Sequence, residues 1–135
     1  MVSVSASLQE ELVRRACEIR NNAYAKYSNY PVGASLLTKD GTIFDGANVE
    51  NASFGLTTCA ERSAVFAAVS VGHREFQAIA IASAGAHAPC GACRQVLTEF
   101  APSLLVFLVD PERPEDVQSV TLDKLLPGRF EFPEK

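Results

Sequence analysis

Three cysteines stand in two clusters with the spacing of metal ligands. Cys59 lies in "TTCAERSA", and Cys90 and Cys93 lie thirty residues later in "PCGACRQ". Thiolates bind Zn²⁺; structural zinc sites are closed by four protein ligands, whereas catalytic sites keep three ligands and one open position. Residues three positions apart share a helix face, so the Cys90 and Cys93 sulfurs should point the same way. The pattern predicts a catalytic site that binds one zinc ion per chain.

A glutamate follows the first of these cysteines at a distance of two residues. In the middle of a helix, such residues point about 200° apart, so Cys59 and Glu61 could not meet at one point. At the start of a helix Cys59 can lie at the boundary, and Glu61 can then reach the surroundings of the metal without binding it. A carboxylate there can take a proton from an activated water and deliver it to a substrate. We therefore predict that Glu61 is the catalytic acid and base.

The elements that position these residues follow from the hydrophobic pattern and the turn signals. Both cysteine clusters fall where a helix begins, and the positive end of a helix favours thiolates. The order of elements predicts a three-layer α/β fold, with helices on both faces of a mixed sheet. We expect one domain over residues 1–135. The expected elements are a helix in 7–27, a strand hairpin in 32–50 turning at 39–41, a helix at 59–71, a strand at 76–84, a helix at 91–100, a strand at 103–110 and a short helix at 121–128 capped by Thr121.

Composition narrows the classes of function. The chain of 135 residues is 47% hydrophobic with a formal net charge of −4, and its lysines and arginines are scattered. That balance argues against disorder and against a partner held by its phosphate backbone, such as DNA or RNA. No apolar run has the length of a membrane span, and the N-terminal residues lack the apolar block of a signal peptide. We expect a cytoplasmic protein with no membrane partner, in which Cys17 packs as a small apolar residue.

The two clusters resemble the metal motif of the zinc nucleoside deaminases, in which a ligand, a glutamate two residues on and a P-C-x-x-C segment recur. Within that superfamily, the three-cysteine form is similar to the small, homotetrameric cytidine deaminases. Four segments are similar in order: "YSNYPVGASLL", "NVENASFGLTTCAERSA", "PCGACRQVLTEF" and "LLPGRF". The resemblance covers residues 10–130 and implies a central mixed sheet of about five strands. It implies hydrolysis of cytidine and deoxycytidine to uridine and deoxyuridine with release of ammonia, a step of pyrimidine salvage.

The resemblance also implies substrate-binding residues. The backbone N–H of Ala60 would bind the carbonyl oxygen of the base. Asn48 and Glu50 match the pair that binds the ribose, and residues two apart at a strand end face the same side. Tyr30 stands where the family usually has Phe, so its hydroxyl needs a partner or water. Phe54 stands where Tyr is frequent, in a role that the sequence leaves open.

Two further residues complete the implied site. Phe130 matches an aromatic residue that closes over the base in a neighbouring subunit of the homotetramer. Arg62 matches an arginine that donates to the ligand sulfurs. Three thiolates leave Zn²⁺ with a net charge of −1, which should make its bound water a poorer acid. Donation from a guanidinium would withdraw part of that charge.

Other readings of the same residues remain open. A structural zinc module would close the site with a fourth ligand, His87 or His73, although we expect both histidines to be ordinary loop and turn residues. A deaminase of a nucleoside antibiotic such as blasticidin S shares the cysteine motifs, but the ribose pair in "NVEN" and the segment "YSNYPVGA" favour cytidine here. A polynucleotide-editing deaminase is disfavoured by the acidic charge. The loop at 83–88 is shorter than in some relatives, with an effect that the sequence does not define.

Overall fold

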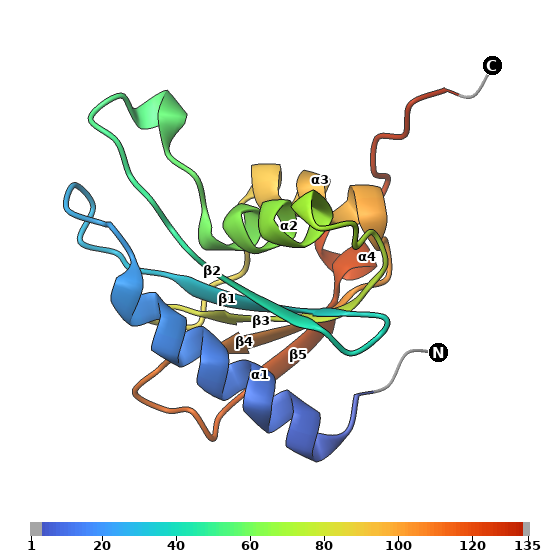
Figure 1. Ribbon diagram of the computed structural model, residues 1–135, viewed down its shortest axis with the longest axis horizontal. Coiled ribbons are helices and arrows are strands. Elements are labelled where there is room, and N and C mark those ends of the chain that lie inside the picture. Colours follow the sequence, from blue (N-terminus) through green and yellow to red (C-terminus); the bar gives the residue numbers. More distant parts are fainter. Residues whose placement is uncertain (1–3, 134–135) are drawn as a thin grey trace.

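The computed structural model describes residues 4–133, in which helices cover both faces of a five-stranded sheet (Figure 1). This three-layer architecture confirms the predicted fold class. The α-helices are α1 (Ala6–Ile19), α2 (Ala60–Ser70), α3 (Gly91–Phe100) and α4 (Leu122–Leu125), with 3₁₀ turns at Arg20–Asn22 and Phe54–Leu56. The strands are β1 (Gly33–Thr38), β2 (Ile43–Ala47), β3 (Phe76–Ala82), β4 (Leu105–Val109) and β5 (Gln118–Thr121).

The strands lie in the order β2-β1-β3-β4-β5. β1 pairs antiparallel with both β2 and β3, β3 pairs parallel with β4, and β4 pairs antiparallel with β5. The parallel pair needs a crossover connection, and α3 provides it on one face of the sheet. The sheet is therefore mixed, as the sequence predicted, and the β3–α3 connection leads from its middle strand to the second cysteine cluster.

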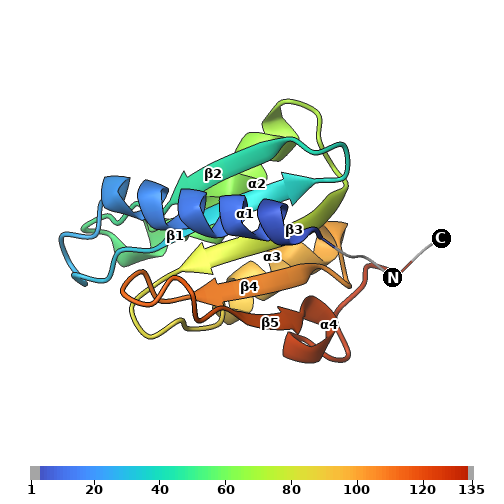
Figure 2. The same cartoon turned by 90° about the horizontal axis from the view of Figure 1, so that it is seen from below.

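Side chains of β3 alternate in size between the two faces. Ile79 and Ile81 pack in the core beneath α2 and α3, whereas Ala78 and Ala80 pack on the face covered by α1. Small residues let α1 approach the sheet closely, and Figure 2 shows this helix lying across the strands. The alternation is that expected of a strand buried on both faces.

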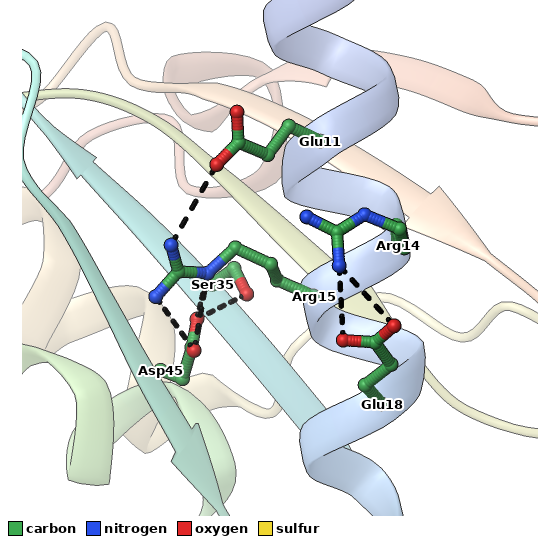
Figure 3. A network of polar contacts seen from close by, with 6 residues as sticks. All are labelled: Glu11, Arg14, Arg15, Glu18, Ser35 and Asp45. Carbon is green, nitrogen blue, oxygen red and sulfur yellow. Dashed lines mark hydrogen bonds and ion pairs between the residues drawn. The ribbon is translucent and has the colours of Figure 1, made fainter.

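A polar contact also ties α1 to the hairpin. Arg15 of α1 donates from Nη2 to Oδ2 of Asp45 at 2.9 Å and from Nε to both carboxylate oxygens (Figure 3). The buried hydroxyl of Ser35 in β1 donates to Oδ1 of Asp45 at 2.7 Å. Asp45 thereby joins α1, β1 and β2. The sequence analysis did not anticipate this contact, because it depends on how α1 packs over the hairpin.

The predicted helix at 7–27 is wrong in its second half. α1 ends at Ile19, and the chain from Tyr24 pairs with the segment after β2: Tyr24 N–H donates to Asn48 O at 2.9 Å, and Glu50 N–H donates to Tyr24 O at 2.8 Å. Short polar side chains at Asn21 and Asn22 are poor helix formers, so they favour the break. The segment 23–32 consequently becomes one side of the cavity described below.

One expectation at the C-terminal end is also wrong, and a second is confirmed only in position. The sequence pattern indicated no strand at Gln118–Thr121, yet β5 forms there by pairing with β4. Thr121 is the N-cap residue of α4, as predicted, but its side chain makes no capping hydrogen bond. In residues 4–133, no helix has both the length and the apolar character needed to cross a membrane.

Candidate active site

The two cysteine clusters meet at the N-terminal ends of α2 and α3, which lie on the same face of the sheet (Figure 1). Cys59 and Cys90 are the N-cap residues of these helices, each with an extended backbone, and Cys93 is buried in the first turn of α3. The three Sγ atoms lie within 4.8 Å of one another, and those of Cys59 and Cys90 are 3.9 Å apart. The prediction that both clusters begin helices is confirmed.

This donor set fits zinc. An ion bound tetrahedrally at about 2.3 Å from each sulfur holds the sulfurs about 3.8 Å apart, close to the separation of Cys59 and Cys90. Among residues 4–133, the metal-binding cluster consists of these three cysteines and includes neither histidine. His73 lies instead beside Asp40 and Phe44. A closed site with His87 or His73 as fourth ligand is therefore not formed.

The start of α2 lies close against β2 because Gly46 has no side chain. A Cβ atom at Gly46 would lie 2.5 Å from the backbone nitrogen of Ala64 and 2.6 Å from the carbonyl oxygen of Ala60. Only glycine permits this approach of helix and strand. Gly46 thus fixes the turn of α2 that carries Ala60 and Glu61.

Glu61 is buried, with 5% of its surface exposed. Burial raises the pKa of Glu61 to about 7, and the negative charge of Cys59 acts in the same direction. A carboxyl group with a pKa near neutrality can both accept and donate a proton there.

The Cys59 thiolate is stabilised by its neighbours. Hydrogen bonding from the Cys93 thiol, followed by donation from Arg62, lowers the pKa of Cys59 to about 5. Nη2 of Arg62 lies 3.1 Å from Sγ of Cys59. The Nε atom of Arg62 is buried and has no hydrogen-bond partner in residues 4–133. Because Nη2 donates to Cys59, the guanidinium faces the metal-binding cluster, which is the geometry expected of a group that withdraws charge from it.

A cavity of about 330 Å³ opens beside the cysteines and Glu61. Its walls come from four parts of the chain: the segment before β1, the segment after β2, the start of α2, and the β3–α3 connection. The lining residues are Ser28, Tyr30, Val32, Asn48, Glu50, Thr57, Cys59, Ala60, Glu61, Ile81, Ser83, His87, Ala88 and Cys90. A larger groove of about 1100 Å³ runs along α1, but none of the predicted site residues lines it.

Asn48 and Glu50 both line the cavity and are fixed by neighbouring backbone. Asn48 accepts from the N–H of Val32 at 2.9 Å and donates to the carbonyl of Tyr30 at 3.0 Å. Glu50 accepts from the hydroxyl of Ser28 and from the backbone N–H of Tyr27 and Ser28, each N–H at 3.0 Å. These bonds, led by that of the Ser28 hydroxyl, lower the pKa of Glu50.

The remaining predicted residues divide into two groups. Ala60 and Tyr30 line the cavity, and the hydroxyl of Tyr30 donates to the carbonyl of Ala84 at 2.8 Å, which is the partner that the sequence left open. Phe54 is 75% exposed and Phe130 is 68% exposed, and neither lines the cavity of its own chain.

Sequence reasoning missed Ser28 and the cavity-lining position of His87. Ser28 is exposed and lies in a polar segment, so nothing in its local pattern distinguishes it from an ordinary loop serine. Its role depends on Glu50, twenty-two positions away. His87 was expected to be an ordinary loop residue; it is not part of the metal cluster, but its side chain forms part of the cavity wall.

Comparisons with known proteins agree with this geometry. The family model for the cytidine and deoxycytidylate deaminase zinc-binding region matches residues 6–109. The chain is 47% identical over 124 residues to the cytidine deaminase of Sporosarcina psychrophila, with 90% of each chain covered. It is 46% identical over 125 residues to that of Halalkalibacterium halodurans, covering 90% of this chain and 93% of the relative.

The fold of the chain is also similar to that of a solved cytidine deaminase structure. The crystal structure of cytidine deaminase from Burkholderia pseudomallei superposes with a TM-score of 0.85 at 46% identity, covering 94% of this chain and all of the other. Likeness in sequence, fold and three-cysteine cluster together show that this chain belongs to the zinc-binding cytidine and deoxycytidylate deaminase family.

Proposed function

We propose that this protein hydrolyses cytidine and deoxycytidine to uridine and deoxyuridine with release of ammonia. The observation that carries the proposal is the shared cavity: the buried carboxyl of Glu61 and the sulfurs of Cys59 and Cys90 line the same space as Glu50. A proton-transfer group, a metal-binding cluster and a polar sugar-binding end are thus combined within a volume suited to a nucleoside.

Glu61 carries the proton transfers in this proposal. When bound by the three cysteines, zinc supplies a Lewis-acidic position at which water becomes more acidic. Glu61 accepts a proton from the attacking water and delivers it to N3 of the cytosine ring. Glu61 then takes the remaining proton from the hydroxyl group formed at C4 and delivers it to the departing amino nitrogen, so that one water is consumed and one ammonia is released. A pKa of about 7 suits a group that must act in both directions.

Other side chains orient the substrate. The backbone N–H of Ala60, at the start of α2, would bind the carbonyl oxygen of the base, and the positive end of the helix supports that role. Asn48 and Glu50 line the other part of the cavity and would bind the sugar hydroxyls. The bonds that already hold these two side chains reduce the entropy lost when the substrate binds.

The charge of the cavity favours a nucleoside over its 5′-phosphate. The described lining contains the carboxylate of Glu50 and the carboxyl of Glu61 but no lysine or arginine. A phosphate group normally requires cationic or N–H donors, and burial of its charge beside carboxylates is unfavourable. This distinction matters because the matching family model covers both cytidine and deoxycytidylate deaminases.

We also propose a homotetramer in which neighbouring subunits complete each site. Several large apolar side chains are exposed in the single chain, and burying them between subunits would be favourable. The most exposed are Phe54, Leu56, Val71, Phe130 and Phe132. Phe130 would then close over the base in a neighbouring cavity. Native mass spectrometry distinguishes a tetramer from smaller assemblies. A cytoplasmic location, where thiolates remain reduced, stays a prediction.

The substrate assignment is tested by an assay of the zinc-loaded protein with four compounds. Deamination, followed as loss of ultraviolet absorbance, should occur with cytidine and deoxycytidine. With deoxycytidine 5′-phosphate, kcat/KM should be at least about a hundredfold lower. Turnover of blasticidin S but not of cytidine would overturn the sugar-binding roles of Asn48 and Glu50. Turnover of the 5′-phosphate at the rate of the nucleoside would contradict the charge argument.

A further inference from the structure

The connection between β3 and α3 forms one wall of the cavity and ends at a proposed zinc ligand. We name residues 83–89 the rim loop. Its members Ser83, His87 and Ala88 line the cavity, and Cys90 follows directly as the N-cap of α3. The position of the rim loop therefore sets the width of the cavity on the side next to the metal cluster.

The rim loop is buried at its two ends, Ser83 and Pro89, and Ala86 packs against the core. The rest of the loop, Ala84, Gly85, His87 and Ala88, is exposed, so hydrogen bonds must locate it. Gly85 has a φ of +82° and Ala86 a φ of +53°, a left-handed conformation that alanine seldom adopts. Within the loop, Ser83 accepts from the N–H of Ala86 and of His87, at 3.0 and 3.1 Å. A segment with few buried contacts opens readily unless other groups fix it.

Arg94 of α3 holds the end of the loop by donating to the carbonyl of Pro89 at 2.7 Å, and two side chains from distant parts of the chain fix its first half. The hydroxyl of Tyr30 donates to the carbonyl of Ala84 at 2.8 Å. The carboxylate of Asp110, just after β4, accepts from the N–H of Gly85 at 3.0 Å. Of these two, Tyr30 is the one that also lines the cavity. Its ring lies 6.3 Å from the imidazole of His87, measured between centroids.

Tyr30 is joined on its other side to the proposed sugar-binding pair. Its backbone N–H donates to Oγ of Ser28 at 3.0 Å, and the same hydroxyl donates to Glu50. Its carbonyl accepts from Asn48 at 3.0 Å. A continuous set of hydrogen bonds thus runs from Glu50 and Asn48 through Tyr30 to the rim loop.

We propose that Tyr30 is a positioning residue whose hydroxyl fixes the rim loop relative to Asn48 and Glu50, and so sets the width of the nucleoside cavity. The kinetic part of this inference rests on the proposed function. Without the hydroxyl, the carbonyl of Ala84 is released to water and the loop samples wider positions. Binding must then order the loop, which weakens binding of the ground state and the transition state equally and raises KM rather than lowering kcat.

The test compares Tyr30→Phe with the zinc-loaded wild-type protein. We expect KM for cytidine to rise by about three- to tenfold, the loss typical of one hydrogen bond, with kcat changed by less than about twofold. Hydrogen–deuterium exchange of the peptide spanning the rim loop should become faster, while bound zinc is unchanged. Tyr24→Phe is the matched control, because the hydroxyl of Tyr24 makes no hydrogen bond within residues 4–133 and its side chain is 49% exposed.

Each other outcome overturns the inference. Unchanged exchange and unchanged KM would show that the hydroxyl does not hold the loop. Faster exchange with unchanged KM would limit Tyr30 to a structural role, and a raised KM with unchanged exchange would mean that the hydroxyl acts on the substrate directly. If the wild-type protein does not deaminate cytidine, the proposed function fails, and the exchange experiment still decides whether Tyr30 holds the loop.

Discussion

The guanidinium of Arg62 donates to the sulfur of Cys59, with 3.1 Å between Nη2 and Sγ. The two residues stand three positions apart at the start of α2, so their side chains are neighbours on one face of the helix. The contact lowers the pKa of Cys59 and raises that of Arg62. A cationic donor against a thiolate reduces the negative charge of the metal-binding cluster.

Replacement of Arg62 by alanine should therefore impair the cluster. Without the guanidinium, the pKa of Cys59 should rise, which weakens zinc binding, and less charge is withdrawn from the cluster, which lowers kcat. We expect zinc affinity or kcat to fall by about ten- to a hundredfold, the usual cost of removing a group that supports metal ligands. A chelator competition assay measures the affinity, and the cytidine assay measures kcat. Arg14→Ala is the control, since Arg14 pairs with Glu18 on the exposed side of α1. Equal behaviour of both variants would refute a role for Arg62 at the cluster.

Gly46→Ala should displace the start of α2. The new Cβ would meet backbone atoms of Ala60 and Ala64 at 2.6 and 2.5 Å, so the helix rather than a flexible side chain must move. We expect the free energy of unfolding to fall by about 1–3 kcal/mol and the activity to fall with it. Chemical denaturation measures the free energy of unfolding. Gly55→Ala, where a Cβ would have no neighbour within 4 Å, should change stability far less.

Asp45→Ala should destabilise the fold more than loss of a surface ion pair does. It removes the closer of the two acidic partners of Arg15, leaving Glu11, and leaves the buried hydroxyl of Ser35 without its acceptor (Figure 3). The expected loss is about 1–3 kcal/mol of unfolding free energy. Glu18→Ala breaks a pair whose side chains are 58% and 63% exposed, and it should cost less than about 1 kcal/mol. Equal losses in thermal denaturation would contradict this ranking.

The stabilising effect of Asp110 should depend on pH. Donation from the backbone N–H of Glu112, and then of Gly85, lowers the pKa of Asp110 below its usual value of 3.8. Because the pKa is lowered in the folded state, this contribution is present above pH 3.8 and is lost as the pH falls further. The difference in Tm between wild type and Asp110→Ala should therefore shrink as the pH is lowered from 5 to below 3.8.

The control for that experiment is Asp116→Ala. The carboxylate of Asp116 makes no hydrogen bond to another residue in the described part of the chain. The difference in Tm between the wild type and Asp116→Ala should stay constant over the same pH range. A constant difference for Asp110→Ala would show that the loop contact at Gly85 contributes nothing.

Much of the site could be predicted because its chemistry lies in short segments. The spacing of Cys59, Glu61 and Cys90 within two helix starts was sufficient to predict the cluster and the carboxylate beside it. The contacts of Tyr30 with Ala84 and of Ser28 with Glu50 could not be predicted, because they join loops whose approach depends on the packing of the whole sheet. These contacts also join the segments that form the walls of the cavity.

The fold was predicted less evenly along the chain. Continuous apolar runs made β3 and β4 evident. β5 was missed because its first residues, Gln118 and Ser119, are polar and exposed, and the strand exists through pairing with β4 at the sheet edge. The end of α1 was misplaced because pairing of Tyr24 with the segment after β2 outweighs the local helical pattern.

The central claim, that Glu61 moves the protons of a zinc-dependent deamination, is tested most directly by Glu61→Gln. Glutamine keeps the size and burial of the side chain but cannot exchange a proton at this position. We expect the variant to fold, to bind one zinc per chain by metal analysis, and to lose at least about a thousandfold in kcat for cytidine. Near-normal turnover with full zinc content would contradict the account.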